Sequence, residues 1–249
     1  MKKLMAANWK MFKTAQEAKD TAAELVELVG DLSEDREVVV FPPFTALHAA
    51  GEVFSKHEGY SFGGQNVCAA SEGAFTGEIS PAMLKDAGCT WVLTGHSERR
   101  ALFGETSEQV GEKTTFALNN GLNVCLCIGE TLEEREAGEL ESVIAEQLEK
   151  GLATIPDTES ARLAVAYEPV WAIGTGKVAG PEEIEEAHAI VRAKLLDILG
   201  GKANTTRVLY GGSVKPENAT QIITLDNVDG VLVGGASLKA ESFSKIVTA

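Results

Sequence analysis

Short apolar runs alternate with amphipathic segments along the chain, and this alternation limits the possible folds more than any other feature of the sequence. Glycine, proline or polar residues bound the apolar runs, which is typical of buried strands. The eight strands predicted in this way are residues 3–8, 37–41, 60–65, 89–94, 122–128, 163–167, 207–210 and 228–233. Strands that alternate with helices form parallel βαβ units, and eight units in 249 residues match a (β/α)8 barrel of the α/β class. We therefore expect a single barrel domain spanning residues 1–249.

The segments between the runs are predicted to be helical. Helices are expected over 15–29, after 44, from 81 with Ser80 as its cap, from about 97, over 106–120, through the charged stretch to 150, over 181–199, from 216 and from about 237. An open doubly wound sheet is the alternative architecture. Such sheets usually carry Gly-x-Gly-x-x-Gly after the first strand, where this chain has Asn8-Trp9-Lys10. The barrel is therefore favoured.

Charge and composition exclude several classes of partner. The formal net charge of −15 argues against nucleic acids and anionic membranes, and no apolar run is long enough to span a bilayer. The amino-terminal residues enter an apolar strand at once, without the longer apolar region of a signal peptide, so a cytoplasmic location is expected. Cys68, Cys89, Cys125 and Cys127 lack the spacing of metal ligands, and we expect reduced thiols, no metal and no cofactor.

Chemically useful side chains follow several of the predicted strands. Asn8 ends the first strand and Lys10 follows it, His96 follows the fourth strand, and Glu168 follows the sixth. The carboxyl ends of barrel strands meet at one rim, where active sites of such barrels lie. Each residue alone has an ordinary structural explanation, but their joint placement predicts a catalytic group. His48, His57 and His188 stand away from strand ends and are expected to be structural.

Glu168 begins a stretch with the composition of a closing loop. A proline follows the carboxylate, then large apolar residues, then a tip rich in glycine. The predicted lid comprises Pro169, Val170, Trp171, Ala172, Ile173, Gly174, Thr175, Gly176 and Lys177. A carboxylate beneath a lid is a candidate general base, and excluding water is expected to raise its basicity.

Glycine pairs after the seventh and eighth strands predict an anion site. Glycine lets backbone N–H groups approach a ligand closely, and the start of a helix adds positive partial charge. Ser213, Gly234 and Gly235 fit a phosphate site, with Ala236 opening the helix and Gly174 adding an N–H from the lid. Such a site binds an anion despite the acidic net charge.

Six motifs covering nearly the whole chain resemble the triosephosphate isomerase family. They are Asn-Trp-Lys at 8–10, Gly-His-Ser-Glu-Arg-Arg at 95–100, Cys-Ile-Gly-Glu-Thr at 127–131, Ala-Tyr-Glu-Pro-Val-Trp-Ala-Ile-Gly-Thr-Gly at 166–176, Tyr-Gly-Gly-Ser-Val at 210–214 and Gly-Val-Leu-Val-Gly-Gly-Ala-Ser-Leu at 230–238. The resemblance implies a TIM barrel that interconverts dihydroxyacetone phosphate and glyceraldehyde 3-phosphate in glycolysis and gluconeogenesis.

The resemblance also implies roles for the residues at the rim. Glu168 would move a proton between adjacent carbons, and His96, as a neutral ring at a helix start, would donate to the enediolate. Asn8 would offer its amide N–H, and Lys10 would supply fixed positive charge. Glu98 is either a second acid or a structural residue that positions Lys10 or the start of a helix. Glu130 and Arg135 are expected to brace the lid, and Cys127 to pack beside Glu168.

The long connection after the third strand is expected to form a homodimer. In the family, the loop containing Phe75, Thr76 and Gly77 inserts into a second subunit, although Cys68-Ala69-Ala70 is smaller here than the family pattern. Two other functions stay open. An aldolase would need a lysine inside the barrel to form a Schiff base, and a non-catalytic barrel could bind phosphate alone.

Overall fold

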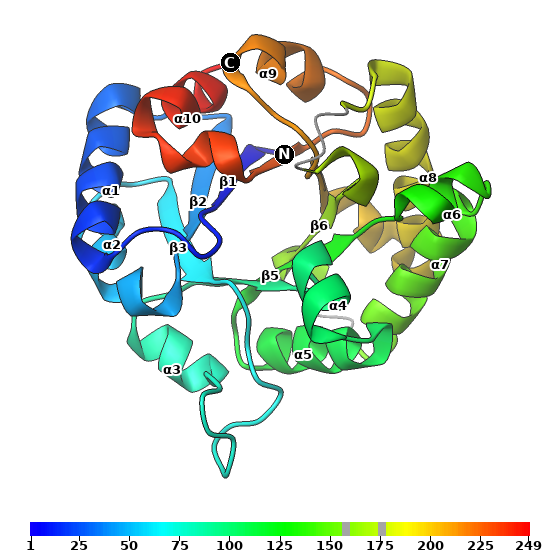
Figure 1. Ribbon diagram of the computed structural model, residues 1–249, viewed down its shortest axis with the longest axis horizontal. Coiled ribbons are helices and arrows are strands. Elements are labelled where there is room, and N and C mark those ends of the chain that lie inside the picture. Colours follow the sequence, from blue (N-terminus) through cyan, green and yellow to red (C-terminus); the bar gives the residue numbers. More distant parts are fainter. Residues whose placement is uncertain (156–159, 174–177) are drawn as a thin grey trace.

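The eight predicted strands form a closed, all-parallel barrel in which each strand pairs with the next and β8 pairs with β1. The computed structural model describes residues 1–155, 160–173 and 178–249. The strands are β1 (Lys3–Asn8), β2 (Arg36–Phe41), β3 (Tyr60–Gly64), β4 (Trp91–Thr94), β5 (Asn123–Ile128), β6 (Leu163–Tyr167), β7 (Arg207–Tyr210) and β8 (Gly230–Val233). The helices surround the strands as an outer ring (Figure 1). The predicted (β/α)8 barrel is confirmed, and the open doubly wound sheet is excluded.

Helices connect the strands as the sequence predicts. They are α1 (Ala15–Val29), α2 (Leu47–Phe54), α3 (Pro81–Asp86), α4 (Ser97–Phe103), α5 (Ser107–Asn119), α6 (Leu132–Glu136), α7 (Leu140–Gly151), α8 (Pro181–Leu199), α9 (Pro216–Ile223) and α10 (Ala240–Val247). The Ser80 hydroxyl caps α3 by accepting a hydrogen bond from the Met83 N–H at 3.4 Å.

The structure corrects two of the predicted helices. The charged stretch before Lys150 is two helices, because Gly138 adopts a φ of +74° and ends α6 before α7 begins. The last helix begins at Ala240, and a short 3₁₀ helix, Gly235–Leu238, precedes it. Ala236 therefore lies inside this 3₁₀ helix and does not open an α-helix.

Two apolar layers stabilise the barrel, one inside the strands and one between strands and helices. Because both faces of each strand are buried, the strands appear in sequence as continuous apolar runs. The inner layer consists of Leu4, Ala6, Val39, Phe41, Trp91, Leu93, Cys125, Cys127, Ala164, Ala166, Leu209 and Leu232. Cys125 and Cys127 share this interior face, as the strand period of two predicts. All four cysteines are free thiols.

His188 belongs to the outer layer. Its side chain on α8 is fully buried, its ring meets the ring of Tyr167 edge-on at 5.9 Å, and its Nδ1 lies 2.9 Å from the carbonyl oxygen of Asn227. Burial lowers the pKa of His188 from 6.5 to about 4. The expected structural role of this histidine agrees with its place in the packed core.

We expect the protonation of His188 to weaken the fold in mild acid. Between pH 6.5 and 4 the unfolded histidine binds a proton that the buried ring does not. The unfolding free energy therefore decreases as the pH is lowered from 6.5 to 4, by up to about 3 kcal/mol. His188→Gln should remove this part of the pH dependence. Urea denaturation of both proteins at neutral pH and at about pH 4.5 measures it, and identical pH slopes would contradict the assignment.

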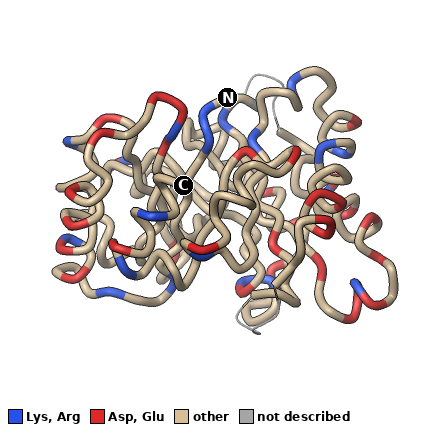
Figure 2. Tube along the Cα trace, turned by 90° about the horizontal axis from the view of Figure 1, so that it is seen from above, with Lys and Arg blue, Asp and Glu red and all other residues tan. Residues whose placement is uncertain are grey.

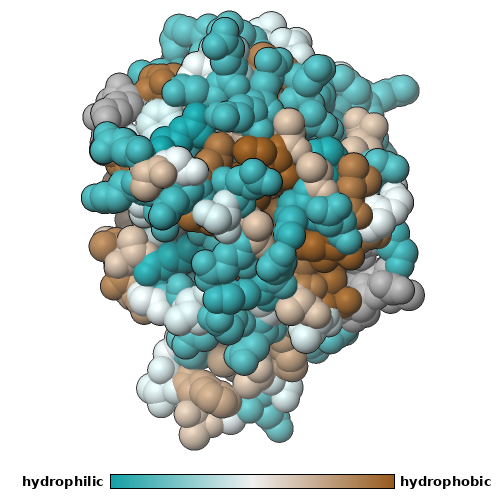
Figure 3. Space-filling view, turned by 90° about the vertical axis from the view of Figure 1, so that its right-hand side faces the viewer, coloured by the Kyte–Doolittle hydropathy of each residue, from teal (hydrophilic) through white to brown (hydrophobic). Residues whose placement is uncertain are grey.

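The connection between β3 and α3 projects away from the barrel (Figure 1), and Figure 3 shows the same projection as a protrusion from the body of the molecule. Acidic residues are spread along the outer helices (Figure 2), in keeping with the net charge of −15. Among the described residues, no helix has the length and apolar character to cross a membrane, and no group of three His, Cys, Asp or Glu side chains is arranged to hold a metal ion.

Candidate active site

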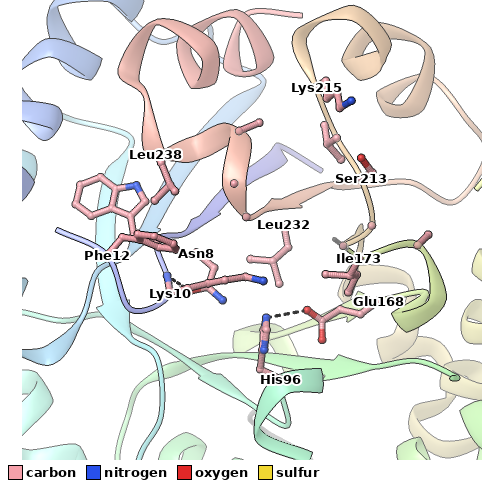
Figure 4. A pocket seen from close by; sticks show the side chains of 18 residues that line it. Asn8, Lys10, Phe12, His96, Glu168, Ile173, Ser213, Lys215, Leu232 and Leu238 are labelled. Carbon is pink, nitrogen blue, oxygen red and sulfur yellow. Dashed lines mark hydrogen bonds and ion pairs between the residues drawn. The ribbon is translucent and has the colours of Figure 1, made fainter. Parts of the chain in front are cut away.

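A cavity of about 400 Å³ opens at the carboxyl ends of the strands, where the sequence predicts the catalytic group. Asn8, Lys10, His96 and Glu168 all line it, although their elements lie far apart in the chain. Figure 4 shows these side chains converging on one space, with His96 and Glu168 directed toward each other. The barrel thus brings together the four residues that were predicted from their positions at the ends of strands.

Two neighbours hold the carboxylate of Glu168. Its Oε1 lies 3.1 Å from Nε2 of His96, and its Oε2 accepts a hydrogen bond from the Ser97 N–H at 2.9 Å. The Glu168 N–H also donates to the Ile128 carbonyl at 2.7 Å. Glu168 is only 2% exposed and His96 6%. The candidate base therefore sits in a water-poor space with both oxygens engaged.

The electrostatics of this pair differ from what the sequence predicts. Burial acts to raise the pKa of Glu168, as expected, but His96, the Ser97 N–H and Lys10 outweigh burial and lower that pKa. Burial acts to lower the pKa of His96, yet the Glu168 carboxylate and Glu98 outweigh it and raise that pKa. The helix start alone therefore does not set the protonation of His96, because a carboxylate faces its ring at 3.1 Å.

The start of α4 nevertheless contacts the ring of His96. The N–H of Glu98 donates to Nδ1 at 3.2 Å, so Nδ1 is an acceptor and Nε2 is left to carry the proton toward the cavity. His96 is thus the N-cap of α4 through its own side chain. The local fold fixes which nitrogen of the ring donates.

Lys10 stands in an unusual backbone conformation. Its φ is +50°, which non-glycine residues seldom adopt, and the Asn8 carboxamide stabilises it by accepting the Lys10 N–H at 2.9 Å. The Lys10 ammonium donates to Glu98 at 2.6 Å. This contact agrees with the expectation that Glu98 positions Lys10. Gln65 adds a further hold by donating to the Lys10 carbonyl at 2.8 Å.

Ser213, Gly234 and Gly235 line the same cavity. A β-carbon at Gly234 would lie 3.3 Å from Cε of Lys10, so the missing side chain leaves room for the lysine. A β-carbon at Gly235 would meet no atom within 4 Å. The two glycines therefore keep a backbone edge open to a ligand. Gly174, expected to add an N–H here, lies outside the described residues, as do Thr175, Gly176 and Lys177.

The first part of the predicted lid is anchored by a buried carboxylate. Glu130 is fully buried, and its Oε1 accepts hydrogen bonds from the Trp171 indole at 2.8 Å and the Tyr167 hydroxyl at 3.0 Å. Its backbone carbonyl accepts the Val170 N–H at 3.1 Å. The Arg135 guanidinium lies 5.9 Å from the Trp171 ring and 3.8 Å from Glu130. Both residues expected to brace the lid therefore contact it.

Several residues of the site are missing from the sequence prediction. The backbone N–H of Ser97 gives no side-chain signal, so its bond to Glu168 cannot be read from the sequence. Gln65 directly follows β3, so the rule that site residues follow strand ends would identify it if it were applied to the third strand as well. Leu232 lines the cavity from β8 and looks like ordinary core in sequence. Gly129 allows the backbone to pass close to Glu168, because a β-carbon at residue 129 would lie 1.8 Å from the Glu168 carbonyl oxygen.

Phe75, Thr76 and Gly77 lie on the projection between β3 and α3, away from the cavity of this chain. The Phe75 side chain is 51% exposed, which is unusual for a large aromatic residue. An exposed aromatic residue on a protruding loop suits contact with another protein surface.

Known proteins resemble this chain over almost its whole length. The family model described as triosephosphate isomerase matches residues 3–249. The triosephosphate isomerase of Nitratidesulfovibrio vulgaris (strain DSM 19637 / Miyazaki F) is 64% identical over 251 residues, covering 100% of both chains. That of Oleidesulfovibrio alaskensis is 62% identical over 250 residues, again covering 100% of both. That of Carboxydothermus hydrogenoformans is 48% identical, covering 99% of this chain and 98% of the relative. The barrel, its gathered rim residues and these matches together place the chain in the triosephosphate isomerase family.

Proposed function

We propose that this chain is an aldose–ketose isomerase that interconverts dihydroxyacetone phosphate and D-glyceraldehyde 3-phosphate through an enediolate. The reaction moves a carbonyl between adjacent carbons, so one proton must leave carbon and return to its neighbour. The observation that carries the proposal is the Glu168 carboxylate facing His96 Nε2 at 3.1 Å in a cavity that also holds Lys10. One base and one donor within hydrogen-bonding reach are what such a proton transfer needs.

Glu168 would act as the base for both carbons. Its oxygens are bound by Ser97 and His96, and those contacts lower its pKa. To take a proton from carbon, the carboxylate must exchange these partners for the substrate. Losing them leaves burial as the dominant influence, and burial raises the pKa. Substrate binding would thus strengthen the base at the moment it is needed.

His96, Asn8 and Lys10 would stabilise the negative charge that develops on the substrate oxygens. The Nε2–H of His96 points into the cavity because Nδ1 is occupied by the Glu98 N–H. The Lys10 ammonium is fixed by Glu98 at 2.6 Å, so little reorganisation is required as charge develops. When Glu168 withdraws from His96, the cause of the raised pKa of the ring is also removed, which favours a neutral donor.

The phosphate group would bind at Ser213, Gly234 and Gly235, with Gly174 joining from the lid. Backbone N–H groups and a short 3₁₀ helix start offer partial positive charge without a basic surface. Pro169, Val170, Trp171, Ala172 and Ile173 would form the body of the lid. Its apolar side chains would exclude water and prevent loss of phosphate from the enediolate.

The alternative functions find less support. Lys3 is the only lysine within the described strands, and it shares its strand face with Met5 and Ala7 of the outer layer, which leaves an aldolase-type Schiff base without an interior lysine. A non-catalytic phosphate-binding barrel would not require the Glu168–His96 pair. A coupled assay with glyceraldehyde 3-phosphate tests the proposal directly, since only an isomerase produces dihydroxyacetone phosphate without a second substrate.

We expect Gly235→Ala to weaken substrate binding while leaving the chemical step almost intact. The added methyl group meets no protein atom within 4 Å, so the fold tolerates it, but it enters the phosphate end of the cavity. KM should rise about tenfold with little change in kcat. Gly201→Ala is the matched control, because its methyl group also meets nothing within 4 Å and lies outside the cavity. An unchanged KM would remove Gly235 from the phosphate site.

We further propose that the chain forms a homodimer through the projection bearing Phe75, Thr76 and Gly77. Phe75 is half exposed, and the apolar side chains of Met11, Leu102 and Phe103 are exposed to a greater extent. Phe75→Asp should convert the dimer to a monomer in sedimentation velocity, and an unchanged sedimentation coefficient would argue against this contact. The expected cytoplasmic location stays a prediction from the sequence.

A further inference from the structure

The guanidinium of Arg100 occupies the point where the ladder between β4 and β5 ends. The last paired residues are Thr94 and Leu126, and Gly95 then turns out of the strand with a φ of +68°. Beyond this point the Gly95 and Cys127 carbonyls both need donors. Arg100 Nε donates to the Gly95 carbonyl at 2.8 Å, and one terminal nitrogen lies 3.4 Å from the Cys127 carbonyl oxygen. The other terminal nitrogen donates to the Ser107 hydroxyl at 3.1 Å.

Gly95 is shaped to accept this contact. A β-carbon at residue 95 would lie 2.9 Å from the Arg100 guanidinium and 2.9 Å from the Cys127 carbonyl oxygen. Glycine is therefore required for space as well as for the positive φ. A planar group with donors along two edges can serve both carbonyls at once, which an ammonium cannot do.

The two strand ends that Arg100 joins carry the groups around the candidate base. The β4 end continues directly into His96 and Ser97, which hold both oxygens of Glu168. The β5 end continues into Ile128, whose carbonyl accepts the Glu168 N–H at 2.7 Å, and into Glu130, which holds the lid. A shift between these ends would change the separation of His96 and Glu168.

We propose that Arg100 is a positioning residue for the isomerisation: its guanidinium clasps the carboxyl ends of β4 and β5 and so sets the distance between His96 and Glu168. This inference rests on the proposed function, because it assigns Arg100 a part in the same reaction. Arg100 does not touch the cavity that holds Lys10 and the phosphate end. It lines a separate cavity of about 260 Å³ behind Glu168, together with Gly95, Ser97 and Gly129.

That second cavity makes a direct test by chemical rescue practicable. Arg100→Ala should lower kcat on the order of 100-fold, because a displacement near 1 Å is enough for such a loss. The Ki of inorganic phosphate as a competitive inhibitor should stay near its parent value, because the phosphate end is distant from the clasp. Guanidinium chloride at about 50 mM, far below unfolding concentrations, should restore kcat about tenfold or more. Urea and sodium chloride at the same concentration should not.

Arg192 provides a matched control. Its guanidinium also donates to two backbone carbonyls, those of Ala203 and Thr206, and pairs with Asp229, all away from the cavity of Glu168. Arg192→Ala should lower the thermal midpoint, keep kcat within a few fold and show no gain from guanidinium. A merely structural Arg100 would behave in the same way.

Arg100→Lys keeps the experiment decisive if the alanine variant fails to fold. It retains the charge but not the planar fork, so kcat should fall about tenfold while the thermal midpoint changes little. The ¹⁵N chemical shifts of the His96 ring nitrogens should also change, and this measurement does not require an active enzyme. A folded alanine variant with parent-like kcat, or a loss that guanidinium does not restore, would overturn the proposal. An inactive parent enzyme would instead overturn the proposed function, and the NMR shift would still report on the clasp.

Discussion

Glu168→Asp is expected to keep the barrel intact and to lower kcat by about 100-fold, because the shorter side chain withdraws the base by about 1 Å from the substrate carbon. The carboxylate is 2% exposed and bound by His96 and Ser97, so its position is set by contacts that aspartate reaches only in part. Steady-state kinetics with glyceraldehyde 3-phosphate measure the loss. KM should change much less than kcat, since the phosphate end is untouched.

Two further measurements separate displacement of the base from damage to the fold. Glu168→Gln keeps the length but removes the proton acceptor, so its kcat should fall further than that of the aspartate variant, by about 10⁴-fold. Circular dichroism and thermal midpoints of both variants should stay close to the parent. If Glu168→Asp turned over within a few fold of the parent, Glu168 would not be the base.

The second large effect is expected from His96→Ala. Loss of the only donor that His96 directs into the cavity should lower kcat by about 10²–10³-fold, the usual result of removing one donor to a developing oxyanion. The variant also removes the acceptor of the Glu98 N–H at 3.2 Å, so α4 loses its N-cap. His96→Gln can still donate from a side-chain amide and should recover part of kcat.

Removal of the imidazole should also change the pH profile of the base. His96 is the first of the contacts that hold down the pKa of Glu168 against burial. Without the ring that pKa should rise, and the acid limb of the kcat/KM profile should move to higher pH. His188→Gln is the matched histidine control, because His188 is buried in the outer layer, and its kcat should stay near the parent value. An acid limb that did not move in His96→Ala would contradict the coupling.

Most of the barrel can be predicted because each strand is buried on both faces, so its sequence is one apolar run. The predicted strand boundaries agree with the structure to within a few residues. For the seventh strand, Arg207–Tyr210, the predicted and observed boundaries are the same at both ends. The break at Gly138 is harder, because glycine within a helical pattern can be tolerated, and only its positive φ shows that α6 ends there.

The site is predictable to the extent that side chains follow strand ends. Asn8, Lys10, His96 and Glu168 all stand at strand ends in the sequence, and all four line the cavity. Contacts made by the backbone, such as the Ser97 N–H on Glu168, leave no trace in residue identity. The pKa directions also need distances, because a helix start and a carboxylate act on His96 in opposite senses, and only the 3.1 Å separation shows which prevails.

The backbone around Glu168 has a consequence for attempts to redesign this protein. The Glu168 N–H is bonded to Ile128, and two residues later the Val170 N–H is bonded to Glu130, so base and lid share one short tether to β5. Gly129 lies between these two anchors and leaves no space for a side chain against the Glu168 carbonyl. Substitutions in the body of the lid are therefore expected to shift the backbone of Glu168 as well. A library that varies the lid to change the substrate range would also change the pKa of the base, and with it the pH optimum.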